Sequence, residues 1–149
     1  MQQVMMDCKH TLLLCTGNYY RSRYAEELFN FYARGDGLAW RAFSRGLAEK
    51  GSPDNLGPMS RFILQALRAK AIVPQGLARF PMTWSLVDFD KAQLVIALKE
   101  AEHRPLLELR FPEMADRVTY WHVDDIDVAE PVDAIATIDR LVRDLIHEI

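Results

Sequence analysis

The chain has 149 residues, a length typical of one domain, and half of them are hydrophobic, which is enough to form a sizeable core. Its formal net charge of −3 argues against nucleic-acid binding, for which a basic surface is expected. The apolar runs at 12–15 and 94–98 are too short to cross a membrane, and the first ten residues lack the basic start and apolar centre of a signal peptide. We therefore expect a single cytoplasmic domain over residues 1–149, without a membrane or nucleic-acid partner.

The first predicted element is a buried strand at residues 12–14, and the next is a helix from about Ser22 to Arg34. A short apolar run is typical of a parallel strand that is buried on both faces, whereas the second segment has helical spacing of its apolar residues. The intervening sequence CTGNYYR is therefore predicted to be a strand-to-helix loop. Free backbone N–H groups at the start of a helix bind anions, so this loop predicts a site for phosphate or sulfate.

Three side chains around this loop have a spacing that suits phosphoryl chemistry: Cys15 begins it, and Arg21 and Ser22 end it. The loop would surround a tetrahedral oxyanion and place the sulfur beneath it for in-line attack. Nearby N–H groups and a guanidinium can lower the pKa of a thiol and so produce a nucleophilic thiolate. A guanidinium also contacts two phosphoryl oxygens at once, and a serine hydroxyl can donate to the sulfur. The alternative interpretation is a buried cysteine that only packs at the end of a strand.

The rest of the chain alternates between strands and helices. We predict a strand at 40–44, a loop at 49–58, a helix at 60–70, an irregular segment at 74–85, a strand at 93–99, a helix at 100–110 with Pro105 in its first turn, a strand at 118–123 and a helix at 131–149. This alternation predicts an α/β domain with a four-stranded parallel sheet and helices on both faces. The loop that begins at Cys15 would lie at the carboxyl end of the first strand, at a topological switch point.

The segment CTGNYYRS resembles the signature of the low-molecular-weight protein tyrosine phosphatases, with Gly17 and Asn18 at the second and third loop positions. Its place near the N-terminus, between a strand and a helix, strengthens the resemblance. The resemblance implies sheet order 2-1-3-4, a phosphocysteine intermediate on Cys15, and a hydrogen bond between Ser44 and Asn18 that holds the loop in its strained shape; for Ser44, an ordinary turn serine is the alternative. It also implies a set of phosphate-binding residues: Thr16, Gly17, Asn18, Tyr19, Tyr20, Arg21 and Ser22.

A phosphatase of this kind needs a general acid for the departing oxygen, and in the family this acid is an aspartate after the last strand. Asp125 matches best by its offset from Val123, Asp124 is the second candidate, and Asp127 matches less well. The family has a proline and an aromatic residue after the acid, whereas Ile126 and Asp127 follow here. The alternative is that these carboxylates only cap or solubilise a loop.

The aromatic residues that border the substrate ring in the family are missing at 48–49 and 127–128. Tyr19, Tyr20 or Trp84 are the candidates to replace them. No metal-ligand spacing links the histidines, which we interpret as surface or structural residues: His10, His103, His122 and His147.

The sequence thus predicts a cysteine-dependent phosphomonoesterase of the protein tyrosine phosphatase type, without cofactor or metal. Its substrate would be a phosphorylated protein or a small phosphomonoester, and its loop would also bind phosphate, sulfate or vanadate. Two alternatives stay open: a non-catalytic phosphate-binding or phosphoprotein-binding homologue, and an arsenate reductase, which in its thioredoxin-coupled form needs two further cysteines where only Cys8 is left. Cys8 and Cys15 flank the first strand, roughly 20 Å apart and too far for a disulfide. The sequence does not indicate an oligomeric state.

Overall fold

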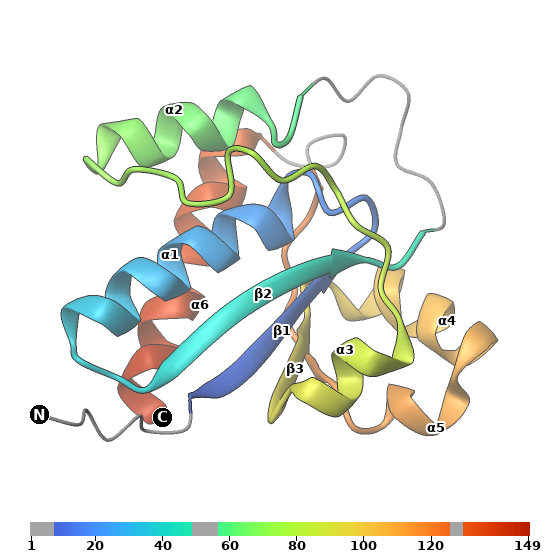
Figure 1. Ribbon diagram of the computed structural model, residues 1–149. Helices are drawn as coiled ribbons and strands as arrows, with labels where there is room; N and C mark the ends of the chain where they lie inside the picture. Colours follow the sequence, from blue (N-terminus) through green and yellow to red (C-terminus); the bar gives the residue numbers. More distant parts are fainter. Residues whose placement is uncertain (1–7, 49–56, 126–129) are drawn as a thin grey trace, which may run out of the picture.

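The computed structural model describes residues 8–48, 57–125 and 130–149. Most of the predicted loop at 49–58, together with Ile126 and Asp127, therefore lies outside the described residues. The elements, in chain order (Figure 1), are β1 (Lys9–Cys15), α1 (Arg21–Gly35), β2 (Trp40–Gly46), α2 (Arg61–Ala69), α3 (Leu86–Lys91), β3 (Leu94–Ala97), α4 (Glu100–Arg110), α5 (Pro112–Ala115), β4 (Thr119–Tyr120) and α6 (Pro131–Glu148).

The four strands form one parallel sheet in the order β2-β1-β3-β4, as predicted. β1 lies between its partners, with Cys15 opposite Gly46 of β2 and Leu14 opposite Ala97 of β3. The carboxyl ends of these strands therefore meet at one edge of the sheet, where the loop after Cys15 begins. β2 lies on one side of β1, and β3 lies on the other side. The order of the strands therefore reverses at β1, which makes this edge a topological switch point.

Alternate side chains of β1 enter two separate cores, which explains why the apolar run of this strand is continuous. Leu13 packs in the core formed with α1, α2 and α6, and Leu12 and Leu14 pack in the core formed with α3, α4 and α5. These two groups of helices lie on opposite faces of the sheet (Figure 1). In the second core, the ring of Trp84 meets the ring of Phe89 edge-on at a centroid distance of 4.8 Å.

Local signals explain where several helices begin and end. The Ser60 hydroxyl accepts a hydrogen bond of 3.1 Å from Phe62 N and so caps α2, and Pro131 occupies the first position of α6, where no N–H is needed. The chain leaves α1 through Gly37, whose φ of 67° favours glycine. None of the helices in the described part of the chain combines the length and the hydrophobicity that crossing a membrane requires.

Some details of the predicted elements were wrong. The last strand is shorter than 118–123, because only Thr119 and Tyr120 pair with β3; the chain then continues beside β3 with single hydrogen bonds, such as Val123 N to Leu98 O at 2.8 Å. Pro105 lies inside α4, in its second turn instead of its first. Proline there removes one helix hydrogen bond, and the helix tolerates it because Pro105 and Ala101, whose carbonyl loses that bond, are both exposed to water.

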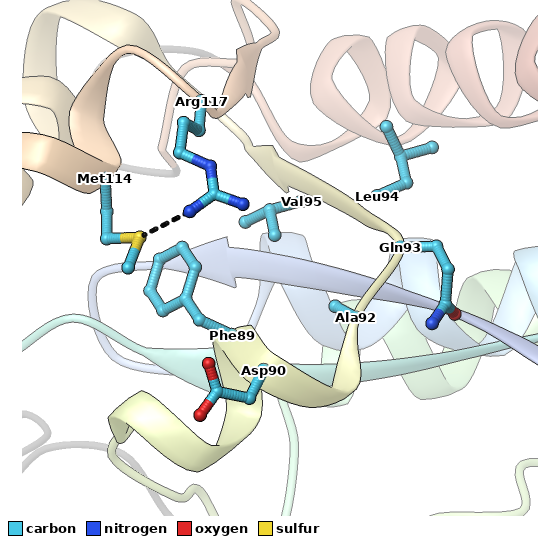
Figure 2. Close-up of a pocket in the computed structure, with 8 residues that line it drawn as sticks. All are labelled: Phe89, Asp90, Ala92, Gln93, Leu94, Val95, Met114 and Arg117. Atoms are coloured by element: carbon cyan, nitrogen blue, oxygen red, sulfur yellow. Dashed lines mark hydrogen bonds between the residues drawn. The ribbon is translucent and has the colours of Figure 1, made fainter.

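The described surface has a hollow of about 250 Å³ between α3, α5 and the start of β3. Figure 2 shows Phe89 and Val95 in this hollow and the Arg117 side chain extended toward the sulfur of Met114. The hollow is at the amino end of β3, where Leu94 pairs with Thr11 of β1, four residues before Cys15. It therefore lies at the opposite end of the sheet from the predicted anion loop.

Candidate active site

The segment Cys15–Ser22, which we call the phosphate loop, forms a compact turn between β1 and α1. The Cys15 Sγ lies 3.0 Å from the Ser22 Oγ, and both residues are buried. Asn18 Nδ2 donates to the same Ser22 oxygen at 2.9 Å. Because that oxygen already accepts a hydrogen bond from Asn18, its own proton is available to the sulfur, and the hydroxyl can stabilise a thiolate.

Asn18 holds the strained part of the phosphate loop. Its backbone has a φ of 52°, a left-handed conformation that is uncommon outside glycine. Besides Ser22, its Nδ2 donates to Ser44 Oγ at 2.9 Å, and its Oδ1 accepts from Arg79 Nη1 at 2.9 Å and from Met82 N at 3.0 Å. The predicted contact between Asn18 and Ser44 is therefore present, and it belongs to a network that surrounds the strained residue.

The end of β2 supports the loop from the side through close backbone contact. Leu47 N donates to Cys15 O at 2.8 Å, and Ala48 N donates to Thr16 O at 3.0 Å. A Cβ atom at Gly46 would lie only 2.8 Å from Thr16 O and 3.2 Å from Asn18 N, both of which are backbone atoms. Position 46 therefore requires glycine for steric reasons.

Arg21 is buried, and its guanidinium is tightly paired. Nη1 and Nη2 donate to the two carboxylate oxygens of Glu102 at 2.9 and 2.8 Å, and Nη1 also donates to Val123 O at 3.1 Å. Asp125 Oδ2 lies 3.4 Å from Nη2. Burial alone would lower the pKa of Arg21, but the hydrogen bond with Glu102 and the nearby Cys15 and Asp125 raise it overall, so the guanidinium stays charged.

Glu102 and His103, in the first turns of α4, are the site residues that the sequence analysis missed. His103 is completely buried, with its Nε2 3.1 Å from Thr16 Oγ1, and the Thr16 hydroxyl donates to Glu102 Oε1. The His103 ring, Arg21 and Thr16 together hold the pKa of Glu102 far below its ordinary range, against the opposing effect of burial. The signal that could have found them is their position: they follow the carboxyl end of β3, beside the phosphate loop.

The structure separates the two described candidates for the general acid. Asp125 is partly exposed and faces Arg21 at 3.4 Å. Asp124 instead pairs with the ammonium group of Lys99 at the start of α4. The geometry thus brings Asp125 closer to the phosphate loop, whereas Asp127 lies outside the described residues.

Of the three aromatic candidates for the substrate pocket, Trp84 was wrong, because it is buried in the core formed with α3, α4 and α5. Tyr20 is also mostly buried, and its hydroxyl donates to Pro131 O at 3.3 Å. Burial and the charge of Asp125 raise the pKa of Tyr20 to about 12, against the effect of Arg21, so this hydroxyl stays protonated. Tyr19 alone among the three keeps a half-buried side chain at the loop.

The two cysteines lie at opposite ends of β1. Cys8 is an exposed free thiol just before β1, whereas Cys15 is buried at the far end of that strand. Within residues 8–48, 57–125 and 130–149, no group of three or more acidic, histidine and cysteine side chains is arranged to hold a metal ion.

A cysteine at the start of a strand-to-helix turn, with an arginine and a serine at its end, is the arrangement of the cysteine-based phosphatases. The chain belongs to the low molecular weight phosphotyrosine protein phosphatase family, whose sequence model matches residues 10–149. Membership of this family supports a phosphoric ester hydrolase. A comparison with curated protein sequences finds no significant match.

Solved structures share the fold over nearly the whole chain. A low molecular weight protein tyrosine phosphatase from T. tengcongensis is 24% identical, with 95% of this chain and 99% of that chain covered and a TM-score of 0.77. YfkJ from Bacillus subtilis is 21% identical, with 95% and 94% covered and a TM-score of 0.81. The YwlE arginine phosphatase from Geobacillus stearothermophilus is 21% identical, with 94% and 92% covered and a TM-score of 0.72. At these identities the similarity establishes the fold.

Proposed function

We propose that the protein is a protein tyrosine phosphatase that works through a phosphocysteine intermediate on Cys15. The observation that carries this proposal is the contact of 3.0 Å between Cys15 Sγ and the Ser22 hydroxyl inside the phosphate loop. A buried sulfur that receives a hydroxyl proton, beneath backbone N–H groups at the start of α1, suits a nucleophile that must exist as a thiolate.

The first step transfers the phosphoryl group from substrate to sulfur. The Cys15 thiolate attacks phosphorus, the S–P bond forms, and the P–O bond to the leaving group breaks while Asp125 gives its proton to the departing oxygen. In the second step, water attacks phosphorus and the S–P bond breaks. The Asp125 carboxylate takes the proton of that water, phosphate is released, and Ser22 stabilises the returning thiolate.

Arg21 stabilises the negative charge that builds up on the phosphoryl oxygens. Because Glu102 occupies the end of the guanidinium formed by Nη1 and Nη2, the edge formed by Nε and Nη2 is left to contact the phosphoryl group. Asp125 lies beside Nη2 at 3.4 Å in the structure. A bound phosphoryl group would neutralise the positive charge at that edge. Asp125 would then lose its contact with Nη2 and could face the leaving oxygen.

Hydrolysis of para-nitrophenyl phosphate by the wild type and by Cys15→Ser tests the proposal. The wild type should turn the ester over, and Cys15→Ser should not, while it keeps binding of phosphate or vanadate because the loop N–H groups and Arg21 do not need the sulfur. Appreciable turnover by Cys15→Ser would overturn the covalent mechanism. Anion binding without turnover in the wild type would favour the non-catalytic homologue.

The leaving group is a separate question, because one solved neighbour is named an arginine phosphatase. A peptide that carries phosphotyrosine and a matched peptide that carries phosphoarginine should be compared by kcat/KM. We expect the phosphotyrosine peptide to be preferred, since the half-buried Tyr19 can contact an aromatic ring at the loop. A preference for phosphoarginine would leave the phosphocysteine chemistry in place and reassign the substrate.

A further inference from the structure

His103 is completely buried, yet both of its ring nitrogens have polar partners. Lys99 N lies 3.0 Å from Nδ1, and Thr16 Oγ1 lies 3.1 Å from Nε2. A backbone N–H can only donate, so Nδ1 must be an unprotonated acceptor. The neutral ring therefore carries its single proton on Nε2, and this fixes the tautomer.

The direction of every following hydrogen bond is then determined. His103 Nε2–H donates to Thr16 Oγ1, and the Thr16 hydroxyl donates its own proton to Glu102 Oε1. Glu102 in turn accepts both guanidinium bonds from Arg21, at 2.8 and 2.9 Å. The chain of contacts thus runs without a break from the first turn of α4 to the guanidinium in the phosphate loop.

We propose that Thr16, Glu102 and His103 form a positioning triad that fixes the orientation of the Arg21 guanidinium toward the phosphoryl group. The proposal rests on the phosphatase function proposed above. Glu102 is one-third exposed, and a carboxylate held only by an arginine could adopt several rotamers. The Thr16 hydroxyl selects the rotamer that presents both oxygens to Arg21. Because Nε2 of His103 carries a proton, it cannot accept from this hydroxyl, which therefore donates to Glu102.

The triad also ties two parts of the site together. Thr16 belongs to the phosphate loop through its backbone and to the triad through its side chain, whereas Glu102 and His103 belong to α4. The position of the loop is therefore coupled to the position of the guanidinium. This coupling keeps the N–H donors of the loop and the Arg21 side chain arranged around one anion. None of the three side chains needs to touch the substrate to have this effect.

Phosphate binding, measured by calorimetry on the intact chain, is the most direct test because it does not depend on turnover. Thr16→Val removes the hydroxyl and keeps the shape of the side chain, and it should weaken phosphate binding roughly tenfold, the size expected for one hydrogen bond to a charged group. Thr16→Ser keeps the hydroxyl and should restore most of that affinity. Equal losses in the two variants would overturn the proposal.

A double-mutant cycle tests whether Thr16 acts through Glu102. In a Glu102→Gln background the carboxylate is already lost, so adding Thr16→Val should weaken phosphate binding less than about twofold further. Independent, additive effects would contradict the triad. Failure of para-nitrophenyl phosphate hydrolysis in the wild type, with this coupling intact, would reject the phosphatase function and keep the triad.

The wild type alone offers a second measurement, which holds even if a variant fails to fold. Nitrogen-15 NMR of the imidazole rings should show His103 as the neutral tautomer with its proton on Nε2. A proton on Nδ1, or a doubly protonated ring at neutral pH, would break the direction of the hydrogen bonds and overturn the proposal.

Discussion

Gly46 is the residue at which β2 comes closest to the phosphate loop, and its missing side chain is what permits the contact. The nearest atoms to a Cβ at this position would be the Thr16 carbonyl oxygen at 2.8 Å and Asn18 N at 3.2 Å. Because both belong to the backbone, neither can rotate away as a flexible side chain could. The shape of the loop and the sequence of β2 are therefore linked through one residue.

Gly46→Ala should consequently displace the phosphate loop. We expect phosphate binding and kcat/KM for para-nitrophenyl phosphate to fall by at least about tenfold, and the free energy of unfolding to fall by about 1–3 kcal/mol, the usual effect of overpacking. The matched control is Gly35→Ala at the end of α1, where an added Cβ has no neighbour within 4 Å. Wild-type activity in Gly46→Ala would show that the backbone contact is not needed.

Asp125→Asn tests whether Asp125 is the general acid. Loss of the proton donor should slow hydrolysis of phenyl or alkyl phosphates by roughly 10² to 10⁴, the usual contribution of general acid catalysis. Esters of acidic phenols should be affected much less, because their leaving group departs as the anion. The rate constants are measured across a series of leaving groups.

Asp124→Asn is the matched control, because Asp124 pairs with Lys99 and not with Arg21. The effect of this substitution on the rate constant should be small and should not change with the leaving group. If the two variants exchange behaviour, the acid is Asp124; if neither shows the dependence, the chain uses another acid.

At the scale of elements, α1 holds the irregular segment before α3 through two buried charged side chains. Glu27 accepts from Gln75 N at 2.8 Å and from Gly76 N at 2.9 Å, and Arg23 Nη2 donates to Gly76 O at 2.8 Å. The same segment carries Arg79, which reaches the Asn18 side chain. The phosphate loop is therefore supported by a segment without regular secondary structure that α1 keeps in place.

Glu27→Ala should detach this segment. Two backbone N–H groups would lose their acceptor and the buried Arg23 would lose a nearby negative charge, so we expect the free energy of unfolding in urea to fall by about 2–4 kcal/mol. Hydrogen exchange of Gln75 and Gly76 should accelerate more than exchange in β1. The control is Glu108→Ala, an exposed ion pair with Arg104 in α4, which should change stability by less than about 1 kcal/mol.

The elements that the sequence predicted are those with a strong local pattern, such as the apolar run of β1 and the helical spacing of α1 and α6. The sequence pattern did not predict α3 (Leu86–Lys91) or α5 (Pro112–Ala115), because four to six residues are too few to show helical periodicity. Glu102 was missed for a different reason. Its partners Thr16 and Arg21 are 86 and 81 positions away in the chain, and no local pattern connects residues at such separations.

The dependence of stability on pH is a property of the whole molecule, and His103 and Glu102 contribute to it with the same sign. Burial and the charge of Arg21 lower the pKa of His103 below 6.5, although Glu102 partly opposes the shift. A group whose pKa is lowered by folding stabilises the protein above its unfolded pKa and loses that contribution as the pH falls through the folded value. The pKa of Glu102 is also lowered by folding, so its contribution to stability is lost as the pH falls below its ordinary pKa of 4.5.

We therefore expect the free energy of unfolding, measured in urea from pH 8 to pH 4, to fall in two stages as the pH is lowered. The first stage begins near pH 6.5, because unfolding then allows His103 to take up a proton, and the second begins near pH 4.5 with Glu102. His103→Gln should lose most of the first stage and keep the second, whatever its overall stability; what is left of the first stage comes from His10, whose pKa is also lowered by partial burial and by Lys91 and Arg41. His147→Gln, at an exposed position of α6, should keep both stages, since that ring meets water in the folded and the unfolded chain. If the curves of the wild type and His103→Gln run parallel between pH 6.5 and pH 5, the buried ring is not the group that makes folding sensitive to acid in this range.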